Sequence, residues 1–115
     1  MDYARIAQCV ATPQTILKEP ISYRQGTAKF TSATVTLQPG ESTNAHKRGV
    51  PTNDYILSDT GTVNYGTPGK RTCRVSTGFM ETMDVWHDGT NDGILPCRIL
   101  GEFMGSNKPT KVIKN

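Results

Sequence analysis

Residues 37–66, with the sequence LQPGESTNAHKRGVPTNDYILSDTGTVNYG, decide the fold, because short strand patterns alternate in them with turn residues. Residues 54–58 and 62–65 contain aromatic and branched aliphatic side chains, and the Asp-Thr-Gly between them is typical of a tight turn. The glycines and proline of residues 66–69 indicate the next reversal. We therefore predict that this part of the chain folds as a β-hairpin or meander.

The alternation of strands and turns continues on both sides of this stretch. Upstream, residues 29–37 (KFTSATVTL) place apolar side chains at every second position near their end, and Gln-Pro-Gly follows them as a stop. Downstream, three further strands are expected, at residues 71–75, 79–85 and 97–104. A turn is expected at residues 88–93. Many short strands at this spacing, without a long amphipathic helix, are typical of a β-sandwich or β-barrel.

The length and composition of the chain fit one globular domain. Its 115 residues are too few for two domains that each bury a core, and 35% hydrophobic with 20% charged residues is typical of a soluble globular protein. We expect the barrel at residues 25–105. Residues 1–24 are expected to pack on the barrel or to swap with a second copy, and residues 106–115 to form a C-terminal tail.

The charges do not indicate a nucleic-acid or membrane partner. The net charge is only +3, and the one basic cluster, Lys70, Arg71 and Arg74, has no aromatic residues interleaved on which bases could stack. No segment approaches the roughly 20 apolar residues that span a bilayer. The first residues contain Asp2 and lack the apolar run of a secretory signal.

The cysteines favour a reducing compartment. Of Cys9, Cys73 and Cys97, one must remain unpaired within a monomer, and none is spaced as C-x-x-C for a structural zinc. We therefore expect buried thiols and a cytoplasmic protein.

Two histidines stand at fixed spacings from a glycine and an asparagine. Gly40 is followed after five residues by His46, and His87 is followed after three residues by Asn91. Residues 78–105, GFMETMDVWHDGTNDGILPCRILGEFMG, supply a Trp-His turn and a late Phe-Met-Gly strand.

In these spacings, residues 25–105 resemble small single-domain cupins, the RmlC-like superfamily with a conserved barrel of the cupin 2 type. The resemblance implies an all-β, double-stranded β-helix (jelly-roll) barrel in a single domain. It also implies a homodimer, since resembling cupins commonly pair.

The cupin pattern is degenerate in this chain. Arg48 stands where the second histidine of the first motif belongs, Thr52 where its glutamate would fall, and Asp59 at its closing glycine. In the second motif three further positions differ, the opening glycine, the proline and the inner glycine being replaced by Ser76, Thr82 and Asp84. Most positions that would bind a metal in the first motif are therefore changed.

Cupins usually hold a divalent metal, iron, manganese, nickel or zinc, through imidazoles and one carboxylate. His46 and His87 are the candidate ligands that remain. If residues 46–48 are extended, His46 and Arg48 share a face, and a guanidinium cannot coordinate a metal and repels a cation. Asp54 and Glu81 are candidate replacement carboxylates, because Asp54 shares a face with Thr52 in a strand and Glu81 has the same parity as His87.

Arg48 admits two interpretations. An arginine inside a small barrel can hold a carboxylate or phosphate through two parallel hydrogen bonds, and it can equally pair with Asp54 or Glu81 and fill the site. The expected ligand-binding residues are Arg48, His46, His87, Thr52, Asp54 and Met83.

Three functions follow as hypotheses. The first is a protein that binds a small, anionic molecule in the barrel, without stoichiometric metal and with no reaction assigned. The second is a metal-dependent enzyme, an oxygenase or isomerase, with His46, His87 and a replacement carboxylate as ligands. The third is a non-catalytic structural or interaction module. The fold does not choose among them.

Overall fold

The computed structural model describes residues 8–83, 85–106 and 112–114, the last of these as backbone only. Every regular element in this part of the chain is a β-strand, as predicted. The strands are β1 (Ala28–Leu37), β2 (His46–Arg48), β3 (Thr52–Ser58), β4 (Gly61–Asn64), β5 (Lys70–Cys73), β6 (Gly78–Met80), β7 (Asp88–Thr90), β8 (Cys97–Ser106) and β9 (Val112–Lys114). No helix among the described residues is long and apolar enough to cross a membrane.

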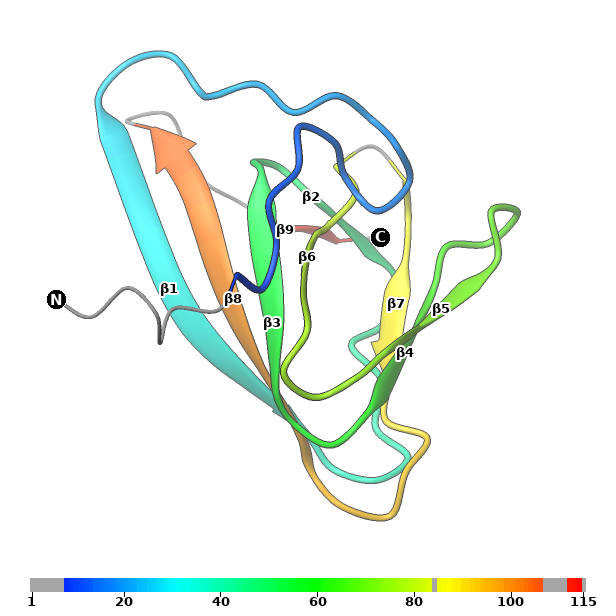
Figure 1. Cartoon of the computed structure of the whole chain (residues 1–115). Coiled ribbons are helices and arrows are strands. Elements are labelled where there is room, and N and C mark those ends of the chain that lie inside the picture. The colour runs from blue at the N-terminus through cyan, green and yellow to red at the C-terminus, as the bar shows by residue number, and fades with distance from the viewer. Residues whose placement is uncertain (1–7, 84, 107–111, 115) are drawn as a thin grey trace, which may run out of the picture.

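The strands form two larger sheets and one small ribbon. The four-stranded sheet has the order β1-β8-β3-β6, the three-stranded sheet the order β5-β4-β7, and β2 pairs with β9. All of these pairs are antiparallel. In Figure 1 the four-stranded sheet lies on the left and the three-stranded sheet on the right, so the space between them is enclosed by both.

The prediction of a hairpin over residues 54–65 is wrong. β3 pairs with β6 and β8, whereas β4 pairs with β5 and β7, so the turn after Ser58 carries the chain from one sheet to the other. Only the next reversal makes a hairpin, β4–β5, with Gly66 and Gly69 at positive φ values of 72° and 98°. The turns after β3 and after β4 have similar turn residues. They differ only in whether the strands on either side of the turn pair with each other.

Two further expectations for the strands differ from the structure. The predicted turn at residues 88–93 begins with β7, which pairs with β4. The predicted strand at residues 79–85 ends early, because β6 stops at Met80.

β9 lies within the stretch expected to be a C-terminal tail. It pairs with β2 in the register His46↔Lys114 to Arg48↔Val112.

Backbone conformation preserves the cupin pattern where the residues do not. Gly40 has a φ of 85°, and Asp59 and Ser76, which stand where the pattern has glycines, have φ values of 59° and 64°. This left-handed region is open to glycine and disfavoured for other residues, with aspartate among the better tolerated. Asp59 and Ser76 therefore hold a backbone conformation that glycine adopts without strain.

The core lies between the sheets, and Ile16 and Leu17 of the N-terminal segment pack against it. Ile56, Val63 and Tyr65 belong to a buried cluster that also contains two free thiols, Cys73 and Cys97. The N-terminal segment also contacts β6, an edge strand of the four-stranded sheet: the Ile16 amide donates to the Met80 carbonyl, and a side chain at Gly78 would meet Cys9 and Val10.

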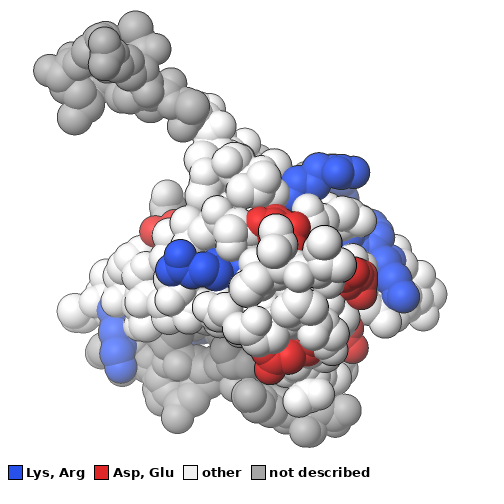
Figure 2. Space-filling view, turned by 90° about the horizontal axis from the view of Figure 1, so that it is seen from below, with Lys and Arg blue, Asp and Glu red and all other residues white. Residues whose placement is uncertain are grey.

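The surface carries no concentrated charge on the face that Figure 2 shows. Lysine and arginine side chains are interspersed there with aspartate and glutamate over a mostly uncharged surface. The ionisable groups with the largest physical consequences are instead buried between the sheets.

Candidate functional site

A cavity of about 120 Å³ lies between the two larger sheets. Its ionisable lining residues come from several strands and loops that are distant in the sequence: His46, Arg48, Asp54, Glu81 and His87. Most of the remaining lining is apolar, as in Val35, Leu37, Ile56, Ile99 and Phe103. The cavity thus joins one polar cluster to an apolar wall.

His46 and His87 face each other across a backbone bridge. The amide of each residue donates to the carbonyl of the other at 2.9 Å, and their ring centroids are 4.5 Å apart. The imidazole Nδ1 of His46 lies 2.8 Å from the Asn44 carbonyl, and that of His87 lies 2.9 Å from the Val85 carbonyl. Because a carbonyl only accepts, each Nδ1 carries a proton and donates to its carbonyl.

Burial keeps His87 neutral. Desolvation lowers the pKa of this imidazole, against the opposite effect of its hydrogen bond to the Val85 carbonyl. The nearby Arg48 guanidinium lowers the pKa of His87 further. His87 therefore presents an acceptor to the cavity.

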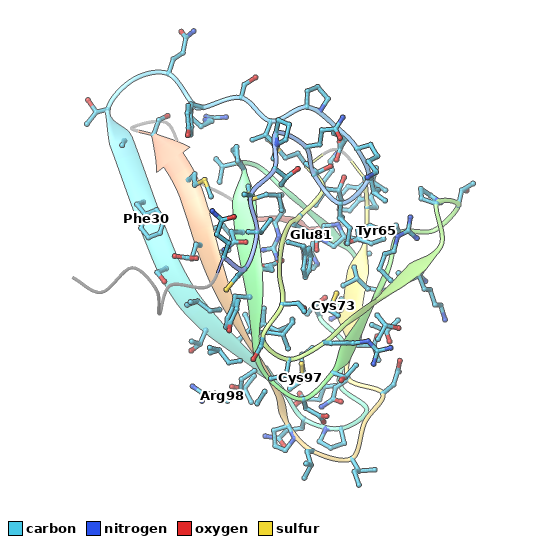
Figure 3. All side chains as sticks on the ribbon, in the orientation of Figure 1. Phe30, Tyr65, Cys73, Glu81, Cys97 and Arg98 are labelled. Atoms are coloured by element: carbon cyan, nitrogen blue, oxygen red, sulfur yellow. The ribbon has the colours of Figure 1, made fainter. Side chains whose placement is uncertain are left out.

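Glu81 is fixed by two donors at one of its oxygens. Its Oε1 accepts hydrogen bonds from the Tyr65 hydroxyl at 2.7 Å and from the Thr82 amide at 2.9 Å. Its Oε2 is 3.7 Å from His87 Nε2. Burial raises the pKa of Glu81 despite these donors. Figure 3 shows Tyr65 and Glu81 together in the space between the sheets.

Arg48 points inward and pairs with Asp54. Its terminal nitrogen lies 3.3 Å from Asp54 Oδ2, and its guanidinium carbon is 5.3 Å from the centre of the Phe103 ring. Burial raises the pKa of Asp54 to about 7, because desolvation of the carboxylate outweighs the attraction of Arg48. The contact with Asp54 is made by the terminal nitrogen, and Arg48 Nε is buried without a hydrogen-bond partner among the described atoms.

Five of the seven residues singled out from the sequence line this cavity, and two do not. Thr52 is fully buried and its hydroxyl donates to the Val50 carbonyl. Met83 is half-buried, and its amide donates to the Glu19 carboxylate at 3.3 Å.

Tyr65 was missed by the sequence reading, although it holds Glu81 in place. Tyr65 directly follows β4 and is two residues from the buried Val63. Because side chains two residues apart share a face of a strand, this spacing is the signal that could have found it.

The ionisable residues of the cavity do not fit a three-ligand metal centre. No group of three His, Cys, Asp or Glu side chains in the described part of the chain is placed to hold a metal ion. The two imidazoles have the backbone hydrogen bonds that orient metal ligands, but Asp54 is paired with Arg48, and the Arg48 cation lies in the same cavity. A divalent ion with Asp54 as its third ligand would therefore meet repulsion from Arg48.

The comparisons with known proteins agree on the fold. No family model matches the sequence, and no curated protein matches it. A solved protein from Klebsiella pneumoniae with a double-stranded β-helix domain is 11% identical, with a TM-score of 0.61, and the match covers 98% of this chain and 94% of that one. The cupin 2 domain of an XRE family transcriptional regulator from Enterobacter cloacae is 20% identical, with a TM-score of 0.55, over 70% of this chain and 84% of that one.

The chain has a cupin fold. The resemblance seen in the sequence is thereby confirmed at the level of structure. Oxalate decarboxylase from Bacillus subtilis is also similar, with 18% identity and a TM-score of 0.60; the match covers 87% of this chain but only 30% of the decarboxylase. That enzyme has Mn(II) centres.

Proposed function

We propose that this protein binds a small organic acid in the cupin barrel, with Arg48 holding the acid group. The observation that carries the proposal is the partly buried Arg48 guanidinium, whose Nε is buried and has no hydrogen-bond partner among the described atoms. An unpaired buried donor costs about 1–3 kcal/mol, and more when it is charged. A ligand carboxylate removes this cost, and two parallel hydrogen bonds to a guanidinium are its preferred geometry.

Asp54 supports the proposal through its protonation. With a pKa of about 7, its carboxyl group takes up a proton readily near neutral pH, and the neutral form no longer competes with a ligand for Arg48. Burial also raises the pKa of Glu81, and when both carboxyl groups are protonated the cavity holds one uncompensated cation, which favours a single negative charge. A ligand with two charges would leave one of them buried and unpaired.

The cavity also limits the size and shape of the ligand. Its volume of about 120 Å³ is somewhat below that of an engineered cavity of about 150 Å³ that binds benzene. The apolar wall suits a short hydrocarbon body, and the polar cluster suits the acid end. The proposed ligand is therefore a monocarboxylate with about six non-hydrogen atoms. No reaction is assigned to the site.

A metal-dependent function is the second candidate, and one observation favours it. Both imidazoles donate through Nδ1 to backbone carbonyls, which is the arrangement that orients histidines as metal ligands. Elemental analysis of purified protein separates the two candidates. We expect less than stoichiometric iron, manganese, nickel and zinc, whereas one equivalent of any of them would contradict the acid-binding proposal.

The proposed function is tested by a pair of probes that differ only in charge. We expect butyrate to shift NMR resonances of residues that line the cavity and the neutral isostere butyramide to bind at least tenfold more weakly, because charge-assisted hydrogen bonds are worth about 1.5–3 kcal/mol. Equal affinity for the two probes, or no binding of butyrate, would rule out an acid site.

A further inference from the structure

Two buried atoms without partners face the same cavity. The described side chains contain four buried nitrogen or oxygen atoms that have no hydrogen-bond partner, and two of them, Arg48 Nε and His87 Nε2, belong to residues that line the cavity. The other two, on Asn53 and Asp59, belong to residues outside this lining. Buried polar groups are nearly always paired, so two such atoms on residues of one cavity point to a ligand-binding site.

The two atoms require opposite partners. Arg48 Nε bears a hydrogen and can only donate. His87 Nε2 can only accept, because the Nδ1 of the same neutral ring donates to the Val85 carbonyl. Glu81 does not meet this need, since its Oε2 is 3.7 Å from His87 Nε2, which exceeds hydrogen-bond distance.

We infer that the ligand is a short hydroxycarboxylic acid, whose carboxylate accepts from Arg48 and whose hydroxyl donates to His87 Nε2. This inference rests on the proposed function. A simple carboxylate satisfies Arg48 but offers only acceptors, so it leaves the His87 lone pair unmatched. A hydroxyl supplies the missing hydrogen without adding a second charge.

The position of the hydroxyl follows from the size of the cavity. A ligand of about six non-hydrogen atoms cannot separate its two polar groups by more than one or two carbons. Arg48 and His87 are also near enough for the guanidinium to lower the pKa of the imidazole. Of these two positions we place the hydroxyl on the carbon next to the carboxylate, which leaves the remaining carbons for the apolar wall of Val35, Leu37 and Ile99.

The inference is tested first on the unaltered protein, where no variant can fail to fold. We expect one enantiomer of 2-hydroxybutyrate to bind about tenfold more tightly than butyrate, the gain of one hydrogen bond to a buried acceptor. The probes are followed by NMR titration. If butyrate binds as tightly as both enantiomers, the hydroxyl has no partner and the inference fails, while the proposed acid site stands. If none of these acids binds, the proposed function itself fails.

A variant of His87 identifies the partner of the hydroxyl. His87→Phe retains a flat ring and removes the acceptor. We therefore expect this variant to bind 2-hydroxybutyrate and butyrate with about equal affinity. Trp86→Phe, at the half-exposed neighbouring residue outside the cavity lining, is the matched control and should retain the tenfold preference. A preference that persists in His87→Phe would overturn the assignment of His87, and the comparison in the unaltered protein keeps the test valid if this variant does not fold.

Discussion

At the scale of single residues, Asp54 is governed by two opposing effects. Burial raises the pKa of its carboxyl group to about 7, while the neighbouring Arg48 lowers it by a smaller amount. The folded protein therefore binds a proton here at pH values where the unfolded chain, with a pKa near 3.8, does not. By linkage, the contribution of Asp54 to stability is largest below the unfolded pKa and falls as the pH rises toward 7.

The direction in which the stability contribution of Asp54 changes with pH can be tested with one substitution. Asp54→Asn cannot ionise, so we expect it to gain stability relative to the unaltered protein as the pH rises from 5 to 8. Urea unfolding at both pH values measures the difference. A stability difference between the two proteins that does not change with pH would contradict the raised pKa of Asp54.

The identity of the cavity residues was partly predictable from residue parity. His46 and Arg48 are two apart in β2 and both line the cavity, as the alternation of side chains in a strand requires. The contact of Tyr65 with Glu81 was not predictable, because it joins the residue after β4 to the segment after β6, and no local pattern records which strands lie opposite each other. Position within a strand can be read from the sequence, whereas partners across the barrel cannot.

At the scale of elements, the left-handed turn at Ser76 tests the relation between sequence pattern and backbone. Ser76 is exposed and has a φ of 64°, at a position where the cupin pattern has glycine. Ser76→Gly relieves this strain, and we expect it to stabilise the protein by up to about 1 kcal/mol, measured as a rise in Tm.

Ser22→Gly is the control for that substitution. Ser22 is also exposed, and it is not among the residues with positive φ, so a glycine there only increases the freedom of the unfolded chain. We expect no stabilisation from it. A Tm that falls equally in both variants would contradict the strain at Ser76.

Elements were predictable where the pattern is long and not where it is short. The predicted strand at residues 29–37 differs by one residue from β1, and the strand at residues 97–104 by two from β8. Three-residue strands such as β7 carry too few side chains for an alternation to be recognised. The turn after Ser58 resembles a hairpin locally, and only the pairing of β3 and β4 in different sheets reveals the crossover.

At the scale of the whole molecule, β1 is the edge strand of the four-stranded sheet. It is ten residues long, pairs with β8 along its whole length and is exposed from Ala28 to Thr36. Exposed long edges without internal charges are sites of strand pairing, and Lys29 is the only charged residue of β1. We propose that two copies of the chain pair through this edge as a homodimer.

The dimer is tested by placing a charge on the edge. We expect the unaltered protein to be a dimer by light scattering at micromolar concentration, and Thr34→Lys to shift it toward the monomer, since lysine blocks pairing at edge strands. Thr72→Lys, at an exposed position of the edge strand β5 in the other sheet, should leave the dimer intact. A monomeric unaltered protein would refute the proposal.

The central claim is that Arg48 makes the cupin barrel an acid-binding site, and isothermal titration of butyrate into matched variants tests it most directly. Lys47 neighbours Arg48 in β2 but lies outside the cavity lining, with its Nζ 5.1 Å from the centre of the Trp86 ring. We expect Arg48→Met to lose at least tenfold in affinity, the loss of a charge-assisted hydrogen bond, and Lys47→Met to retain the affinity of the unaltered protein. Butyrate binding that survives in Arg48→Met, or that falls equally in both variants, would contradict the account.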